Sequence, residues 1–125
     1  MDTAAKRLAT LTDICLALPG AESFTYGQTH YGFTIGKKKF AYYLNDHHGD
    51  GRIGLCCKAG SGEQEALIGS DPEKFYSPAY LGANGWIGVR LDRGAVDWVE
   101  IAELVTESYR LLAPKRMVAQ LESPG

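Results

Sequence analysis

The sequence lacks the motifs that usually mark catalytic and metal-binding domains. It contains no G-x-S-x-G, no H-E-x-x-H, no P-loop and no C-x-x-C, which removes the signatures of nucleophile elbows, zinc proteases, P-loop nucleotide binding and thiol exchange. One G-x-G-x-x-G run, at 49–54, leads into a predicted strand, whereas a pyrophosphate site needs the N-terminus of a helix there. We therefore predict a non-enzymatic module with no catalytic residues and no cofactor, and an enzyme of unknown reaction is kept only as a third alternative after the binding functions below.

Long apolar runs and a basic charge excess are also missing. No apolar run approaches the length of a bilayer span, and residues 1–7 show no apolar stretch before a cleavage site. We expect a cytoplasmic protein with no membrane partner. The cysteines are few and odd in number, Cys15, Cys56 and Cys57, so a disulfide framework is not expected and burial as small apolar residues is predicted.

The composition is that of one ordinary globular domain. Apolar residues make up 45% and charged residues 22% of the 125 residues, enough for a core without disulfide or metal staples. We predict a single domain over residues 1–125, with its core at about 8–113 and a frayed tail at 122–125. The net charge of −2 argues against a uniformly basic nucleic-acid-binding surface.

The charge is nevertheless unevenly distributed. Residues 37–58 carry five cations against two carboxylates, a net of +3, and residues 97–112 carry four carboxylates against Arg110, a net of −3. A molecule polarised in this way can present a basic face to a polyanion despite its negative total charge.

Periodicity predicts an α+β chain in the order α-β-β-β-α-β-β-α. An N-terminal helix, capped by Asp2 or Thr3, ends before Pro19-Gly20, and a long helix begins at Asp97 and kinks or restarts at Pro114. Residues 22–30 are expected to form a loop, and Ser61 is expected to cap a short helix. Strands are predicted at 31–35, 40–44, 52–58, 75–81 (short, at an edge) and 86–92.

Strands joined by short loops predict an antiparallel sheet with helices packed on one face. Strict alternation then divides the side chains between two faces. The face toward the helices is expected to carry Phe33, Ile35, Phe40, Tyr42, Leu44, Ile53, Leu55, Cys57, Ile87, Val89 and Leu91. The face away from the helices is expected to carry small residues, two aromatic rings and two cations: Thr34, Ala41, Tyr43, Gly54, Cys56, Lys58, Trp86, Gly88 and Arg90. A shift of one residue in any strand would reverse its assignments.

Several short motifs, in this order and spacing, carry a resemblance to a known family. They are Leu18-Pro19-Gly20, Gly36 followed by Lys37–Phe40, Leu55, Lys58, Pro78-Ala79-Tyr80, Gly85-Trp86, Asp97 and Ser108-Tyr109. The chain resembles the MmcQ/YjbR family of small bacterial α+β domains, which carry the label "double wing" DNA-binding. The resemblance covers about residues 8–113 and implies a fold similar to secretion chaperones and a DNA-binding role.

The outer sheet face and the adjoining hairpin form the candidate nucleic-acid site. Aromatic rings stack on bases, and lysine and arginine meet phosphates. An alternative is that the same face binds a protein, either a second copy or a partner chain; it could also be covered and purely structural. The hairpin lysines could simply be solvated and protect an edge. The predicted residues are Lys37, Lys38, Lys39, Tyr43, Lys58, Trp86 and Arg90.

Loop aromatics suggest a second site, a small-ligand pocket. Phe24, Tyr26, Tyr76 and Tyr80 could line it, with His30 and Gln28 as polar contacts. Such aromatics could instead cap a core edge. The polar loop 46–50 contains Asp46, His47, His48 and Asp50, which could hold a transition metal weakly, but a solvated loop is the simpler interpretation, and we predict no metal site.

Overall fold

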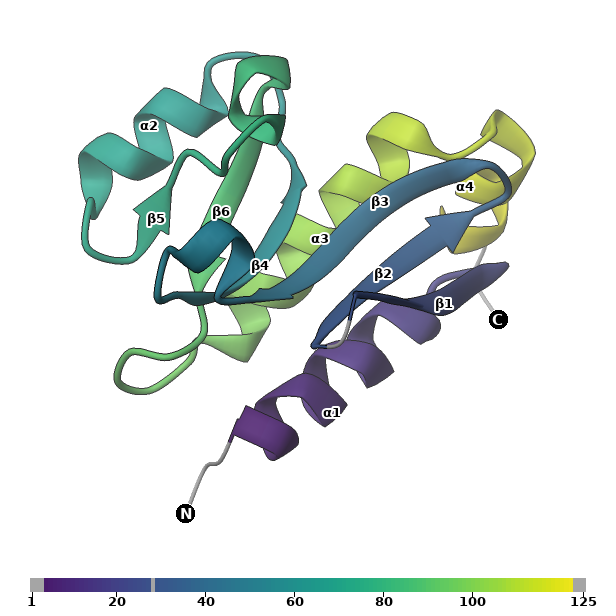
Figure 1. The fold of residues 1–125 in the computed structure, drawn as a ribbon. Coiled ribbons are helices and arrows are strands. Elements are labelled where there is room, and N and C mark those ends of the chain that lie inside the picture. Colours follow the sequence, from purple (N-terminus) through teal and green to yellow (C-terminus); the bar gives the residue numbers. More distant parts are fainter. Residues whose placement is uncertain (1–3, 28, 123–125) are drawn as a thin grey trace.

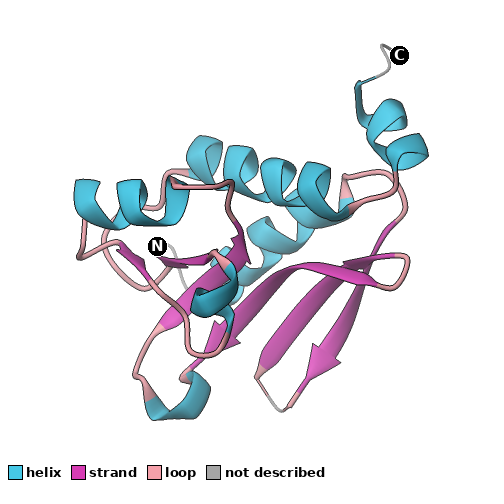
Figure 2. Cartoon of the chain, turned by 90° about the horizontal axis from the view of Figure 1, so that it is seen from above, coloured by secondary structure: helices cyan, strands magenta, loops and turns pink. Residues whose placement is uncertain are grey.

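A six-stranded antiparallel sheet forms the centre of the molecule, with the long helices α1 and α3 packed on one of its faces (Figures 1 and 2). The computed structural model describes residues 4–27 and 29–122, with only the backbone of Tyr26 and His48. Spatially the strands follow the order β1-β2-β3-β4-β6-β5. In chain order the elements are α1 (Ala4–Leu16), β1 (Ala21–Tyr26), β2 (His30–Ile35), β3 (Lys38–Asn45), the 3-10 turn η1 (His47–Gly49), β4 (Ile53–Lys58), α2 (Glu63–Ser70), β5 (Phe75–Tyr76), the 3-10 turn η2 (Leu81–Asn84), β6 (Trp86–Arg90), α3 (Trp98–Leu112) and α4 (Lys115–Glu122).

The α+β class and most of the predicted elements are confirmed. Asp97 is the N-cap of α3, and its side chain accepts a hydrogen bond from the amide of Glu100 at 3.1 Å. A separate helix, α4, follows Pro114. The predicted caps Asp2 and Thr3, and residues 123–125 of the tail, lie outside the described residues. No helix in the described part of the chain is both long and apolar enough to cross a membrane.

Three predictions about elements are wrong. Residues 21–26 form the edge strand β1 instead of a loop; the exposed side chains of Glu22, Ser23 and Thr25 hide the alternation that marks a half-buried strand. The N-cap of α2 is Gly62, with no side-chain cap, so Ser61 does not cap this helix. The strand predicted at 75–81 has only two residues, since the chain turns away after Tyr76.

A β-bulge in β3 overturns part of the predicted face assignment. Phe33 pairs with Ala41 but Thr34 pairs with Lys39, which leaves Phe40 as the extra residue. Phe40 and Ala41 therefore both join the core between sheet and helices, and the alternation beyond them is reversed. Tyr43 packs in this core at 3% exposure. Tyr42, which was expected to face the helices, takes the outer position expected for Tyr43.

The main core lies between the sheet and the helices. Leu11 and Cys15 of α1, together with Ile101 and Val105 of α3, pack against apolar side chains of the strands. All three cysteines are buried and unpaired, which confirms their prediction as small core residues.

The opposite face, here called the outer face, is built on one register row that crosses the sheet. Its residues, from β1 to β5, are Phe24, Gly32, Tyr42, Cys56, Gly88 and Tyr76. A β-carbon on Gly32 would lie 2.1 Å from the Phe24 ring, and one on Gly88 would lie 2.4 Å from the Tyr76 ring. The two glycines therefore allow edge-strand rings to lie flat across the sheet.

Candidate nucleic-acid interface

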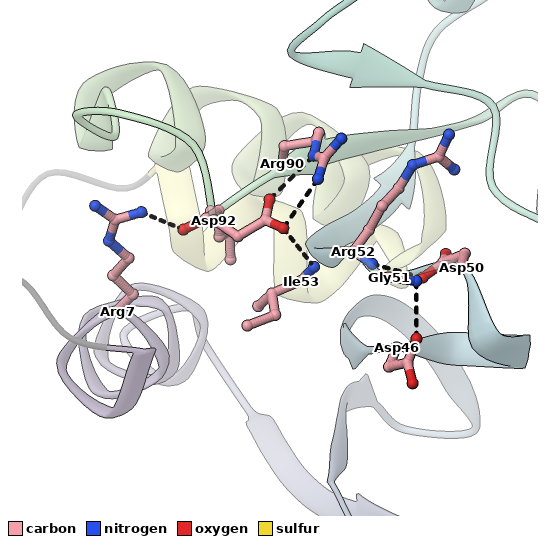
Figure 3. Close-up of polar contacts among 9 residues, drawn as sticks. Arg7, Asp46, Asp50, Gly51, Arg52, Ile53, Arg90 and Asp92 are labelled. Atoms are coloured by element: carbon pink, nitrogen blue, oxygen red, sulfur yellow. Dashed lines mark hydrogen bonds and ion pairs between the residues drawn. The ribbon is translucent and has the colours of Figure 1, made fainter.

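The predicted basic outer face is interrupted at Arg90, whose charge is already paired. Its guanidinium donates to both carboxylate oxygens of Asp92, each at 3.0 Å, and Asp92 also accepts from the amide of Ile53 at 3.3 Å (Figure 3). The hydrogen bond to Asp92 raises the pKa of Arg90. Burial by itself would raise the pKa of Asp92, but the bonds from Arg90 and Ile53 and the guanidinium charge lower it. An anion approaching Arg90 would have to compete with this carboxylate.

Three further predicted residues make contacts within the fold that limit their access to a ligand. The ammonium of Lys58 donates to the carbonyl of Asn84 at 3.3 Å. Trp86 is 8% exposed and packs with Leu44, Cys56 and the half-buried Leu81, and Tyr43 faces the helices. The interpretation of the outer face as an open platform is therefore wrong in its central part, where the segment after β5 and the Tyr76 ring cover the sheet.

The three hairpin lysines remain accessible. Lys37, Lys38 and Lys39 are all exposed. Ile35 pairs with Lys38 across a two-residue turn whose first central residue, Gly36, has φ +60°, as type II′ hairpins require. The ammonium of Lys39 lies 5.8 Å from the centre of the Phe24 ring, so one cation of the hairpin faces the aromatic row of the sheet.

Beside Lys39 the outer face is hollowed into a pocket of about 500 Å³. Its floor comes from β1 and β3, and its rim comes from η1 and the segment between β5 and β6. Phe24 and Tyr42 meet edge to face with ring centres 6.4 Å apart, and Tyr42 lies 5.8 Å from Trp86. This volume falls in the range of small-molecule sites, which are mostly apolar with a few polar groups. The lining residues are Phe24, Lys39, Tyr42, Leu44, His47, Ala79, Tyr80 and Leu81.

The structure thus merges parts of the two predicted sites. Tyr80, predicted for a ligand pocket, and Lys39, predicted for nucleic acid, line one cavity. His30 is not among its lining residues: its Nδ1 accepts the amide hydrogen of Asn45 at 3.0 Å, and its ring packs on His47. The side chain of Tyr26 and all of Gln28 lie outside what the structure describes.

Sequence reasoning missed Tyr42, Leu44 and His47 as lining residues. Tyr42 and Leu44 were assigned to the core because alternation was counted through the bulge at Phe40. The available signal was the run Phe40–Leu44, whose five consecutive apolar or aromatic residues fit a strand buried on both faces better than an alternating one.

The carboxylates of the loop between β3 and β4 accept hydrogen bonds from backbone amides of the same loop. Asp46 accepts from the amide of Gly51, and Asp50 accepts from that of Arg52, both at 2.8 Å (Figure 3). Such bonds replace a regular turn and hold residues at positive φ; Asp46 itself has φ 55°. Among the described side chains, no group of three His, Cys, Asp or Glu residues is placed to hold a metal ion.

A second polar cluster on the outer face does not supply a nucleophile. The Tyr76 hydroxyl and the Cys56 sulfur are 3.9 Å apart, and the Arg52 guanidinium stacks 4.3 Å from the centre of the Tyr76 ring. Burial raises the pKa of Cys56 to about 12 and also raises that of Tyr76. Because thiol chemistry needs the thiolate, Cys56 stays protonated and unreactive at neutral pH.

The fold and this site define a small α+β domain with an aromatic pocket on the open face of an antiparallel sheet. The sequence model of the YjbR family matches residues 16–111. The chain belongs to the YjbR family. A search of curated proteins gave no match.

A solved structure with a similar fold is that of the Deinococcus radiodurans protein DR2400, a domain of the family DUF419. It is 24% identical, its TM-score is 0.71, and the match covers 94% of this chain and 88% of that one. At this identity the likeness concerns the fold.

Proposed function

We propose that this YjbR domain is a non-enzymatic module that binds nucleic acid through the lysine hairpin and the aromatic pocket. The observation that supports it best is the composition of the pocket, in which Lys39 stands beside Phe24, Tyr42 and Tyr80. A nucleotide combines a planar ring with an anionic phosphate. Aromatic side chains stack on the ring, and lysines neutralise the phosphate, so the two kinds of residue recognise its two parts.

The negative net charge does not oppose this proposal once the charges are located. Lys37, Lys38 and Lys39 are consecutive exposed residues of one hairpin, and Lys39 lies on the pocket side of the sheet. Exposed carboxylates such as Glu103 and Glu107 belong to α3 on the helix side. A strand lying along the hairpin would therefore meet a local positive potential. With only a few phosphates neutralised, the affinity is expected to be modest and strongly dependent on salt.

The test is fluorescence anisotropy of labelled DNA titrated at low and at physiological salt. Lys37→Glu/Lys39→Glu should weaken binding at least tenfold at low salt and flatten the salt dependence by about two phosphate contacts. The matched control is Lys6→Glu/Arg93→Glu, two exposed cations on α1 and after β6, elements that lie away from the β2–β3 hairpin (Figure 1). Equal losses in both double variants, or no binding by the wild type, would refute the proposal.

The volume of the pocket favours a second candidate, the binding of a free anionic aromatic molecule. About 500 Å³ accommodates a single nucleotide or a ligand of similar size. Calorimetric titration with nucleoside monophosphates tests this candidate directly. Saturable binding that Tyr42→Ala removes and Lys37→Glu leaves in place would assign the pocket to such a ligand.

A further inference from the structure

The pocket rim holds its most exposed aromatic side chain in a strained backbone conformation. Tyr80 has φ 65° and ψ −47°, and the amide of Leu81 donates across it to the carbonyl of Ala79 at 2.7 Å. This is the γ-turn with positive φ at its centre, a rare and strained form. The tyrosine is 80% exposed, so burial of its ring does not explain why the chain adopts this turn.

The strained turn is held from the helix α2. The side-chain nitrogen of Gln64 donates to the carbonyl of Gly82 at 2.9 Å and to that of Trp86 at 2.6 Å. Gln64 thus uses both hydrogens of its amide to join the two ends of the segment that follows Tyr80. Gly82 packs so closely that a β-carbon on it would lie 2.0 Å from the Ser77 hydroxyl, and its own amide bonds the carbonyl of Pro78 at 2.8 Å.

Strain that the surrounding structure over-determines is typical of binding sites, where it positions a group for a ligand. Here the group is the Tyr80 ring, which lines the rim of the pocket whose floor is Phe24 and Tyr42. Resting on the nucleic-acid function proposed above, we infer that the pocket receives one unpaired base of a strand between Tyr80 and the floor rings. Gln64 is then a positioning residue, since it acts on the base only through the turn that presents Tyr80.

This assignment names single-stranded nucleic acid as the ligand class. The bases of a duplex are stacked on both faces, and only an unpaired or extruded base offers a ring for sandwiching. The phosphates on either side of that base would lie toward Lys39 and the hairpin, because Lys39 forms part of the same pocket wall.

The experiment compares a labelled single strand with a strand of equal length and charge in which the bases are replaced by abasic sites. The wild type should bind the base-bearing strand roughly tenfold more tightly, in line with the stacking of one base. Tyr80→Ala should abolish this preference, and Tyr80→Phe, the matched control, should keep it. Gln64→Leu should reduce the preference several-fold and leave the salt dependence unchanged, a separation that general destabilisation would not produce.

The outcomes distinguish this inference from the function it rests on. Failure of the wild type to bind either strand at low salt would overturn the nucleic-acid function itself. Equal binding of both strands would leave that function standing and overturn base capture alone. A preference that survives Tyr80→Ala, in a variant shown to be folded by its circular dichroism, would also overturn it. If a free nucleoside monophosphate competed effectively at the same concentration as the strand, the proposal that the captured base belongs to a strand would be overturned.

Discussion

Asp92 joins the end of β6 to the start of β4. Its carboxylate accepts two hydrogen bonds from Arg90 and one from the amide of Ile53, and its side chain is 20% exposed (Figure 3). Nearby, Arg7 of α1 donates to the carbonyls of Leu91 and Gly94. This corner of the sheet therefore depends on charged groups where the apolar core ends.

We predict that Asp92→Asn lowers the free energy of unfolding by about 1–2 kcal/mol at pH 7, because a charge-assisted pair is lost. The pKa of Asp92 is lowered in the folded state, so its contribution is complete above the unfolded pKa of about 3.9 and is lost as the pH falls through the folded value. Urea unfolding at pH 7 and pH 3 measures the difference, which should shrink at pH 3. The exposed Glu103→Gln is the control, and a deficit that does not change with pH would contradict the assignment.

At the level of single residues, sequence reasoning was most successful where one physical force decides. The cysteines were predicted as buried apolar residues and are buried, and Asp97 was predicted as a helix start and is one. The predicted outer position of Tyr43 is wrong because the face on which this side chain lies depends on the register of the whole strand. Arg90 was correctly read as a cation on the outer face, but its neutralisation by Asp92 is a tertiary consequence of how the β6 end turns.

At the bulge in β3, a side chain of α3 forms hydrogen bonds to the backbone of the sheet. Ladder pairing between β3 and β4 stops at Ala41 and Cys57, which leaves the next backbone groups without a ladder partner. The hydroxyl of Ser108 fills this gap: it accepts from the amide of Lys58 at 2.9 Å and donates to the carbonyl of Phe40 at 2.6 Å. Ser108 is fully buried. Its hydroxyl on α3 thus supplies the hydrogen bonds that β3 and β4 do not make to each other at this point.

We predict that Ser108→Ala destabilises the domain by roughly 2–3 kcal/mol, because two buried backbone groups lose their partner at once. Denaturant unfolding measures the loss. Ser23→Ala, on the exposed edge strand β1, should change stability by less than about 0.5 kcal/mol. A loss below about 1 kcal/mol in Ser108→Ala would show that water or a backbone shift satisfies these groups.

Elements with strong periodicity could be predicted from the sequence, and those shaped by the rest of the fold could not. The helix α3 has an apolar stripe and a capping aspartate, and its prediction needed nothing else. The strand β1 lies at an edge, and its exposed polar side chains carry no alternation. The bulge adds one residue to β3 without any glycine or proline to mark it, so alternation carried through Phe40 misplaced every later side chain of that strand.

For the whole molecule, the candidate site forms only when distant segments meet. Phe24 and Tyr42 are brought together by the pairing of β2 with β1 and β3, and Tyr80 arrives from a segment held by α2. Composition and charge alone suggested a broad basic face. On the outer side the folded chain leaves the hairpin Lys39 exposed, pairs Arg90 with Asp92 and buries the predicted tryptophan. The tryptophan is buried because the segment after β5 crosses the face that alternation left open.

The separation of charge between the two sides of the sheet leads to a prediction about rates. If a strand binds on the outer face, Glu103 and Glu107 of α3 repel it through the whole molecule without touching it. Removing this repulsion should act on diffusional encounter, which depends on the summed field, and not on the bound contacts.

Glu103→Lys/Glu107→Lys should therefore raise the association rate of single-stranded DNA several-fold at low salt and leave the dissociation rate nearly unchanged. The gain should largely vanish near 0.15 M salt, where the screening length is about 8 Å. Stopped-flow mixing measures both rates, and Glu103→Gln/Glu107→Gln, with half the charge change, should give an intermediate rate. A slower dissociation in the lysine variant would instead mean that α3 contacts the strand, which would move the interface from the outer face to the helices.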